Sequence, residues 1–396
     1  MHTLDAGTGY TMKEPQSDHS LTAVEKGMPM GELLRRYWHP VGLSGDATAT
    51  PKAVRVLAEN LVLFRDGLGR PGLVHERCAH RGASLFYGKV EEQGIRCCYH
   101  GWLFDREGKC LQQPCEPEGG KFRANVRQPW YPVQELYGLI FAYLGPPDKK
   151  PVLPRYQILE QLAEGELIEA DDSSIGGGGP PIIACNWLQH YENVVDPFHV
   201  PILHGSFSGV QFVELMGKMP QQVTFDHGDS GVTVTSVRTT DEGDTFVRVT
   251  QAAMPTLRVV PNPRVGEIGP VDTIGWVLPI DSGSFRIYTV GKVKAVGQLT
   301  SVRSRLNGKL WEDLTPEEHQ RFPGDHEAQV SQGVVASHSH EHLATSDRGI
   351  VMLRRFLKKQ LDAITAGQDP AGVSFDDAAP PVAFKAGNFL TKKEQA

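Results

Sequence analysis

Two short motifs of cysteine and histidine constrain most strongly how this chain can fold. Cys78 and His80 form one motif, Cys97 and His100 form the other, and sixteen residues separate His80 from Cys97. Two thiolates and two imidazoles from two loops are the ligand set of a two-iron, two-sulfur cluster in which histidines replace cysteines on one iron. A structural zinc site also uses paired loops, but the C-x-H spacing of the first motif and the glycines soon after both histidines favour the cluster.

A second candidate site lies further along, between Asn193 and His204. If the segment is helical as far as His199, then Asn193, Asp196 and His199 recur along one stripe of the helix. On an unbroken helix His204 would point about 140° away from His199, because each residue turns about 100°. We predict that Pro201 ends the regular helix and that the chain then turns His204 back toward His199.

Two histidines and one carboxylate form a ligand set that leaves positions open for dioxygen, as non-haem Fe(II) oxygenases require. The alternative interpretation of this segment is a buried polar helix end whose histidines are satisfied by hydrogen bonds. The cysteine and histidine motifs upstream favour the metal site.

Composition narrows the class of protein. The 396 residues, 40% hydrophobic and 22% charged, indicate a soluble globular protein with one large or two ordinary domains. A net charge of -7 without a Lys/Arg run argues against nucleic acid, and no stretch approaches about 18 consecutive apolar residues, so no membrane span is expected. Residues 1–20 have no apolar signal-peptide core, and we expect a cytoplasmic protein.

The motifs together resemble the Rieske non-haem iron oxygenases, in particular the single-subunit branch that includes phthalate dioxygenase. CAHRGASL followed by CCYHGWLFD looks like the family's Rieske domain, and ENVVDPFHVPILH is similar to its mononuclear-iron motif. The resemblance implies that a [2Fe-2S] cluster and a mononuclear Fe(II) are bound, the first by Cys78, His80, Cys97 and His100 and the second by His199 and His204. Cys98 stands where the family usually has proline, and we expect it to be a non-ligating thiol.

The expected fold class is α+β. It consists of an all-β Rieske domain followed by a catalytic domain that, by the resemblance, is an antiparallel helix-grip (START-like) sheet. We place an N-terminal segment that packs on the catalytic domain at 1–45, the Rieske domain at 46–150 and the catalytic domain at 151–396. Alternating patterns predict strands over 54–66, 72–76, 232–237, 245–249 and 285–290. The glycine-rich stretch 173–181 is expected to be a loop without phosphate-binding value.

The third iron ligand is expected to be a carboxylate later in the chain. Asp347 opens a strongly amphipathic segment and would lie in the first turn of a long helix, where an anion is favourable. The resemblance places the family's carboxylate at the matching position, so we predict Asp347, with Glu341 as the alternative. Histidines at alternate positions, His338, His340 and His342, could form a different metal site on one face of a strand.

The resemblance also implies roles for two polar residues and a set of partners. Asp196 would bridge His199 of its own chain and His100 of a neighbouring chain, within a head-to-tail homotrimer. Asn193 looks like the family's iron-proximal asparagine. A separate reductase, with or without a ferredoxin, would deliver electrons from NAD(P)H, since the chain shows no flavin or nicotinamide motif.

The expected substrate is an aromatic compound such as an aromatic acid or aryl ether, oxidised with O2. Ring hydroxylation and O- or N-demethylation stay open as alternatives, and a non-catalytic Rieske electron carrier is a third hypothesis from another class. Four arginines on predicted strands could bind a substrate carboxylate, namely Arg238, Arg248, Arg258 and Arg264.

Overall fold

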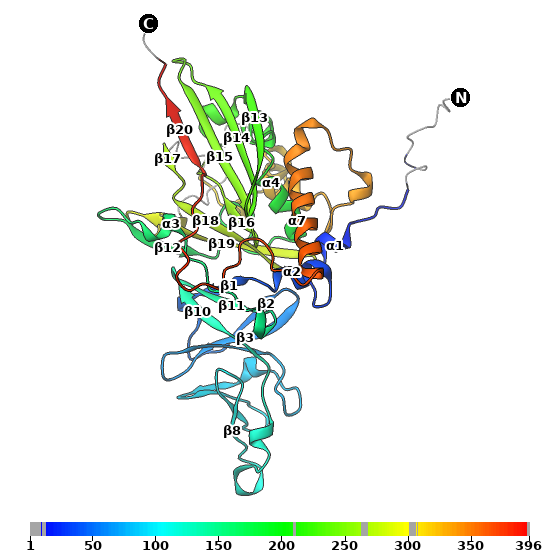
Figure 1. Ribbon diagram of the computed structural model, residues 1–396, viewed down its shortest axis with the longest axis vertical. Helices are drawn as coiled ribbons and strands as arrows, with labels where there is room; N and C mark the ends of the chain where they lie inside the picture. Colours follow the sequence, from blue (N-terminus) through cyan, green and yellow to red (C-terminus); the bar gives the residue numbers. More distant parts are fainter. Residues whose placement is uncertain are drawn as a thin grey trace.

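The computed structural model describes residue 9 and residues 13–208, 211–262, 268–300, 306 and 308–393. In this part of the chain three small antiparallel sheets lie toward one end of the molecule and one large antiparallel sheet lies toward the other (Figure 1). Helices pack beside the large sheet (Figure 1). The expected α+β class is confirmed.

The small sheets are built from residues 38–143. One has the strand order β1 (Trp38–Leu43), β11 (Leu139–Tyr143) and β10 (Val133–Leu136). The second contains β2 (Lys52–Val56), β3 (Glu59–Arg65), β4 (Pro71–His75) and β9 (Trp130–Tyr131). The third contains β5 (Lys89–Glu91), β6 (Gly94–Arg96), β7 (Leu103–Phe104) and β8 (Cys110–Gln112), and its strand connections carry part of the cluster motif.

The prediction of a single strand over 54–66 is wrong, because a hairpin divides this stretch into β2 and β3. Its turn residues, Leu57 and Ala58, have positive φ angles of 47° and 65°. Two-residue hairpin turns require positive φ, which normally favours glycine or asparagine. Leu57 and Ala58 carry no such turn signal, and Leu57 is instead fully buried, so packing compensates for the unfavourable backbone.

The large sheet forms the second half of the molecule. Its strands run in the order β12 (Leu167–Asp171), β19 (Ser284–Val293), β18 (Thr273–Asp281), β16 (Leu257–Val259), β15 (Thr245–Ala253), β14 (Gly231–Thr239) and β13 (Gln222–Gly228). β20 (Gly387–Thr391) pairs with β15 and with β17 (Gly269–Pro270). The predicted strands at 232–237, 245–249 and 285–290 lie within β14, β15 and β19 and are confirmed.

One long helix, α7 (Arg348–Thr365), packs against β13 and β14. Leu353 and Leu357, on its apolar stripe, are fully buried. The shorter helices are α1 (His19–Thr22), α2 (Pro29–Leu34), α3 (Gln157–Glu160), α4 (Trp187–Asn193), α5 (Pro316–Arg321) and α6 (Asp325–Val330). α4 contacts both β18 and α7, while α1 and α2 also pack on α7. A membrane-crossing helix is not found among the described residues.

Two hydrophobic cores hold these elements together. The larger core joins the large sheet, α4 and α7 to β1 and β11, and includes Trp187, Trp276 and Phe141. The smaller core, which includes Phe64 and Phe104, lies among the strands that flank the cluster motifs. α4 belongs to the larger core and β8 to the smaller one, and the two elements lie far apart, toward the two ends of the elongated molecule (Figure 1).

Candidate active site

The two cysteine and histidine motifs fold into two similar turns. In the first, the Gly82 N–H donates to the carbonyl of Cys78, and in the second the Gly101 N–H donates to the carbonyl of Cys97. Gly82 and Gly101 have φ angles of 76° and 72°, a conformation that glycine adopts without strain. These glycines therefore allow each loop to fold back so tightly that its thiol and its imidazole lie close together.

The turns bring the four predicted cluster ligands together. Cys78 and Cys97 are buried and neighbour one another, while His80 and His100 are half-buried. The two imidazole rings pack edge to face with their centroids 4.5 Å apart, and His80 also stacks on Trp102 at 4.3 Å. Buried thiols with imidazoles at the rim match the donor set of a histidine-ligated two-iron cluster.

The chain around His199 and His204 differs from the predicted helix. α4 ends at Asn193, and a π-helix spans Val200–Phe207 with His199 as the residue before it. Pro201 lies in the first turn of this second helix, where a proline costs no backbone hydrogen bond. It does not terminate α4, which already ends at Asn193.

The π-helix explains how two histidines five residues apart come together. A π-helix bonds residue i to residue i+5, so residues at this spacing lie nearly above one another, whereas an α-helix would separate them. The ring centroids of His199 and His204 are 5.5 Å apart. The predicted meeting of the two histidines is correct, although its geometric cause is a π-helix.

Asp325 completes a group of three metal-binding side chains with His199 and His204. One ligand atom from each residue lies within 4.8 Å of the others. Oδ1 of Asp325 is 3.2 Å from Nε2 of His204 and 3.7 Å from Nε2 of His199. Burial raises the pKa of the Asp325 carboxyl, but the two imidazoles outweigh burial and hold that pKa well below its usual range. The donors fit a ferrous ion with open positions.

Asp347, the predicted third ligand, is not part of this group in the structure. Its carboxylate accepts a hydrogen bond from the N–H of Ala344 at 2.7 Å and so closes the turn before α7. Asp325 begins α6, so both residues lie at helix starts and share the local signal on which the prediction depended. Only the fold decides which of these two helix starts faces the histidines.

The other candidates for the metal site lie elsewhere. Glu341 forms an ion pair with Arg354, which also binds Glu192. Nδ1 of His338 accepts the N–H of Asp18, and Nε2 of His340 lies 2.8 Å from the carbonyl of Lys13. These side chains therefore tie α4 and the N-terminal segment to α7 and the stretch before it. His342 is exposed in the same stretch.

Three polar side chains surround the metal-binding group. The amide nitrogen of Asn193 lies 3.1 Å from Oδ1 of Asp325 and 3.2 Å from Nε2 of His199. Asp196 has Oδ2 3.5 Å from Nδ1 of His199 and accepts the backbone N–H of His199 through Oδ1. The amide oxygen of Gln211 is 2.8 Å from Nδ1 of His204. Asn193 and Asp196 were singled out in the sequence, whereas Gln211, an isolated glutamine, carried no recognisable signal.

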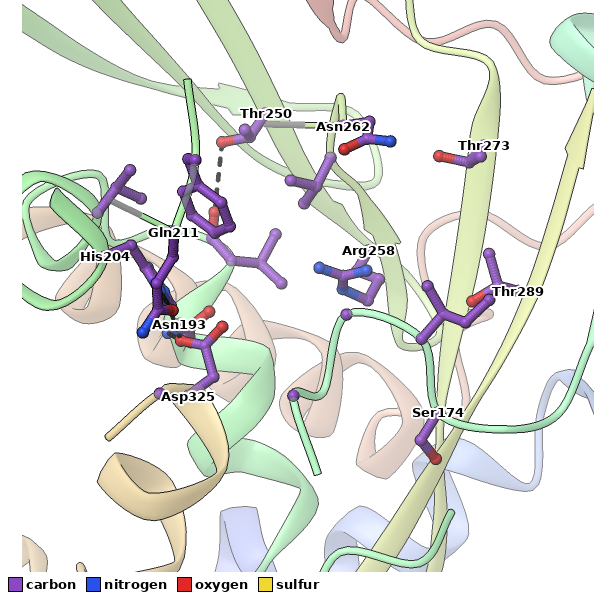
Figure 2. A pocket seen from close by; sticks show the side chains of 18 of the residues that line it. Ser174, Asn193, His204, Gln211, Thr250, Arg258, Asn262, Thr273, Thr289 and Asp325 are labelled. Carbon is purple, nitrogen blue, oxygen red and sulfur yellow. Dashed lines mark hydrogen bonds and ion pairs between the residues drawn. The ribbon is translucent and has the colours of Figure 1, made fainter. Parts of the chain in front are cut away.

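The metal-binding group opens onto a cavity of about 300 Å³ between the helices and the large sheet. Figure 2 shows His204, Asn193 and Asp325 on one side of it, and Thr273 and Thr289 on the other. Its apolar lining includes Val194, Val200, Phe212, Val234, Val260 and Leu299. A mostly apolar cavity with a few polar groups suits a small organic substrate.

Three of the four arginines considered from the sequence line this cavity, namely Arg238, Arg248 and Arg258. They project from β14, β15 and β16. Arg264 lies outside the described residues. The glycine-rich stretch expected to be a loop also lines the cavity, through Gly176, Gly178 and Gly179.

Comparisons with known proteins agree with this geometry. A model of the Rieske [2Fe-2S] domain family matches residues 37–132. The chain is 49% identical to phenoxybenzoate dioxygenase subunit alpha from Ectopseudomonas oleovorans, a match that covers 98% of this chain and 96% of the relative. It is 31% identical to the 5,5'-dehydrodivanillate O-demethylase oxygenase subunit from Sphingobium sp. (strain NBRC 103272 / SYK-6), over 93% of this chain and 85% of that one.

Solved structures share the fold at lower sequence identity. Pseudomonas putida CBB5 NdmA with caffeine superimposes with a TM-score of 0.62 at 20% identity, covering 89% of this chain and all of that one. Dicamba monooxygenase bound to dicamba superimposes with a TM-score of 0.60 at 16% identity, covering 85% and 99% of the two chains. At these identities the two comparisons show a shared fold and no more.

Proposed function

This chain belongs to the Rieske non-haem iron oxygenases, and we propose that it inserts oxygen from O2 into an aromatic acid that carries an aryl ether. The observation that carries the proposal is the group of His199, His204 and Asp325 at the wall of a cavity. The 49% identity to a phenoxybenzoate dioxygenase subunit supports the substrate class, since that relative is named for an aryl ether with a carboxylate.

We assign the ligands of both metal groups from the donors that lie together. Cys78 and Cys97 would hold one iron of the [2Fe-2S] cluster, and His80 and His100 the other. His199, His204 and Asp325 would hold the mononuclear Fe(II). When bound, the cluster supplies electrons and the mononuclear iron activates O2.

Neighbouring side chains would hold these ligands in place. Asp196 can accept a hydrogen bond from Nδ1–H of His199, which leaves Nε2 free for the metal. Asn193 can donate to the Asp325 carboxylate and fix the direction of its oxygens. The apolar lining of the cavity would exclude water around an aromatic ring.

The oxygenase works with a separate reductase, and the resemblance supports a head-to-tail homotrimer in which one chain's cluster faces the next chain's mononuclear site. Two observations favour this arrangement. β8, in the small sheet that carries part of the cluster motif, and α4 lie far apart within one chain (Figure 1). The Asp196 side chain is 28% exposed, so a carboxylate bound to His199 is also accessible to His100 of a neighbouring chain. A cytoplasmic location, where NAD(P)H is available, is part of the same proposal.

Oxygen uptake with a surrogate reductase and NADH tests the function. We expect uptake that depends on 3-phenoxybenzoate, with phenolic or diol products by mass spectrometry. If no aromatic acid in a broad panel supports oxygen uptake, the proposal is contradicted. The metal count provides a second readout: an oxygenase binds the two irons of the cluster and one more per chain, whereas an electron carrier binds the cluster alone.

O-demethylation is the second candidate, because a relative of 31% identity is an O-demethylase oxygenase subunit. The same metal-binding group would serve it, and only the position of the substrate in the cavity would differ. Formaldehyde release from a methoxybenzoate, in step with oxygen uptake, would identify demethylation.

A further inference from the structure

The three arginines that line the cavity differ in their hydrogen bonds. Arg238 donates to the carbonyl of Lys218 at 2.8 Å and to Oγ of Ser236 at 3.0 Å. Arg248 donates to Oδ1 of Asn388 at 3.0 Å and to the carbonyl of Pro261 at 2.5 Å. Both guanidinium groups are thus engaged by the protein and hold strands together.

Arg258 has no such partner among the described residues. Its Nε is buried without a hydrogen bond, and no ion pair of its guanidinium is found in the described chain. Figure 2 shows its guanidinium inside the cavity, between His204 and Asp325 on one side and Thr273 and Thr289 on the other. Burial lowers the pKa of Arg258 and the charge of Asp325 only partly offsets this effect, so the arrangement favours a further anionic ligand.

Two glycines leave the room that the Arg258 side chain occupies. A Cβ added at Gly176 would lie 2.4 Å from Nη1 of Arg258, and one added at Gly275 would lie 2.7 Å from its Cγ. Gly176 has a φ of +82°, which independently favours glycine. The glycine-rich loop therefore accommodates the arginine at the wall of the cavity.

A second unused polar group lines the same cavity. Oγ1 of Thr289 is buried without a hydrogen-bond partner, and the residue is 4% exposed. A carboxylate has several lone pairs and can accept from a guanidinium and a hydroxyl together. Lys292, another cation of the cavity wall, differs because it already lies 3.8 Å from the carboxylate of Glu166.

We propose that Arg258, assisted by Thr289, binds the carboxylate of the substrate and thereby sets which ring carbon faces the metal-binding group. The inference rests on the proposed function and deepens it, because it assigns the residue that selects acids over neutral aromatics. The ring of the bound substrate then extends from Arg258 toward His204 and Asp325. The distance between a ring carbon and the substrate's own carboxylate determines whether that carbon reaches the metal-binding group and reacts.

The test compares an acid with its neutral isostere. Dissociation constants of 3-phenoxybenzoate and 3-phenoxybenzamide are measured by anaerobic calorimetry on the holoenzyme and on Arg258→Gln and Arg258→Lys. We expect Arg258→Gln to weaken binding of the acid about 10- to 100-fold and of the amide less than about threefold, since a charged hydrogen-bonding group is lost. Arg258→Lys should recover part of the affinity for the acid, because it keeps the charge but not the planar pair of donors.

Lys292→Gln distinguishes a specific anchor from a general positive potential. We expect it to weaken the acid far less than Arg258→Gln does. An equal loss in the two variants, an equal loss of acid and amide in Arg258→Gln, or a wild-type protein without preference for the acid would each overturn the inference. Oxygen uptake by the wild-type protein with 3-phenoxybenzoate would persist in each of these cases if the proposed function is correct, so the two failures are distinguishable.

Discussion

The amide oxygen of Gln211 lies 2.8 Å from Nδ1 of His204, and the backbone N–H of Gln211 donates to the carbonyl of the same histidine at 2.9 Å. An amide oxygen only accepts, so Nδ1 carries the proton and Nε2 keeps its lone pair. The amide nitrogen of Gln211 also reaches the carbonyl of Pro323, two residues before Asp325, at 3.4 Å. Gln211 therefore connects His204 to the segment that leads into Asp325.

Replacing Gln211 by leucine removes the acceptor that sets this tautomer. We expect the affinity for mononuclear iron to fall about 10- to 100-fold, as is typical when the hydrogen-bond partner of a ligand histidine is lost. Iron titration of the apoprotein measures it. Gln211→Glu keeps an acceptor and should retain the iron, and the cluster's visible spectrum should be unchanged in both variants. An unaltered affinity in Gln211→Leu would rule out this role.

A second prediction separates Asp325 from Asp347. Asp325→Ala should lose the mononuclear iron and the oxygen uptake, because a carboxylate ligand is missing. Asp347→Ala is the matched control at another helix start, and it should retain iron while losing about 1 kcal/mol of stability with its cap. Metal analysis and denaturant unfolding of both variants provide the check. Loss of iron from Asp347→Ala alone would reverse the assignment.

The proposed route between neighbouring chains predicts the behaviour of Asp196→Asn. We expect cluster and iron to stay bound while turnover falls at least about tenfold, because an amide is a weaker partner for the two imidazoles. Stopped-flow oxidation of the reduced cluster in the presence of substrate measures the transfer directly. Asp226→Asn, an exposed position on β13, is the control. Normal cluster oxidation in Asp196→Asn would exclude the route.

A fourth prediction concerns stability and pH at His39, which is fully buried in β1 with Nε2 2.8 Å from the carbonyl of Leu34. Burial lowers the pKa of His39 to about 4, against an ordinary value of 6.5. Between these values the unfolded chain binds the proton and the native chain does not, so stability falls as the pH falls through this window.

The size of this effect follows from the shift. Relative to His39→Gln, which has no proton to gain, the wild-type protein should lose about 2 kcal/mol of unfolding free energy between pH 7 and pH 5. Denaturant unfolding followed by tryptophan fluorescence at both pH values measures the difference. Parallel pH profiles of the two proteins would show that His39 is not responsible.

Local patterns were sufficient for much of the fold and part of the site. The cysteine and histidine motifs carry their own turn signals in Gly82 and Gly101, so spacing predicts which side chains meet. The amphipathic stripe of α7 and the alternation in β14, β15 and β19 depend on burial of one face, which is legible in sequence. The hairpin at Leu57 and Ala58 was missed because buried packing, not turn chemistry, stabilises it.

The sequence by itself determined the metal groups and the family, because ligand type and spacing are local properties of Cys78, His80, Cys97, His100, His199 and His204. Only the tertiary structure decided which carboxylate joins the two histidines and which arginine is free. Asp325 and Asp347 both begin helices, and Arg238, Arg248 and Arg258 all lie on strands beside one cavity. The two aspartates, and likewise the three arginines, differ in which neighbours satisfy their hydrogen bonds. Those neighbours are far apart in sequence and meet only when the helices and the sheet pack together.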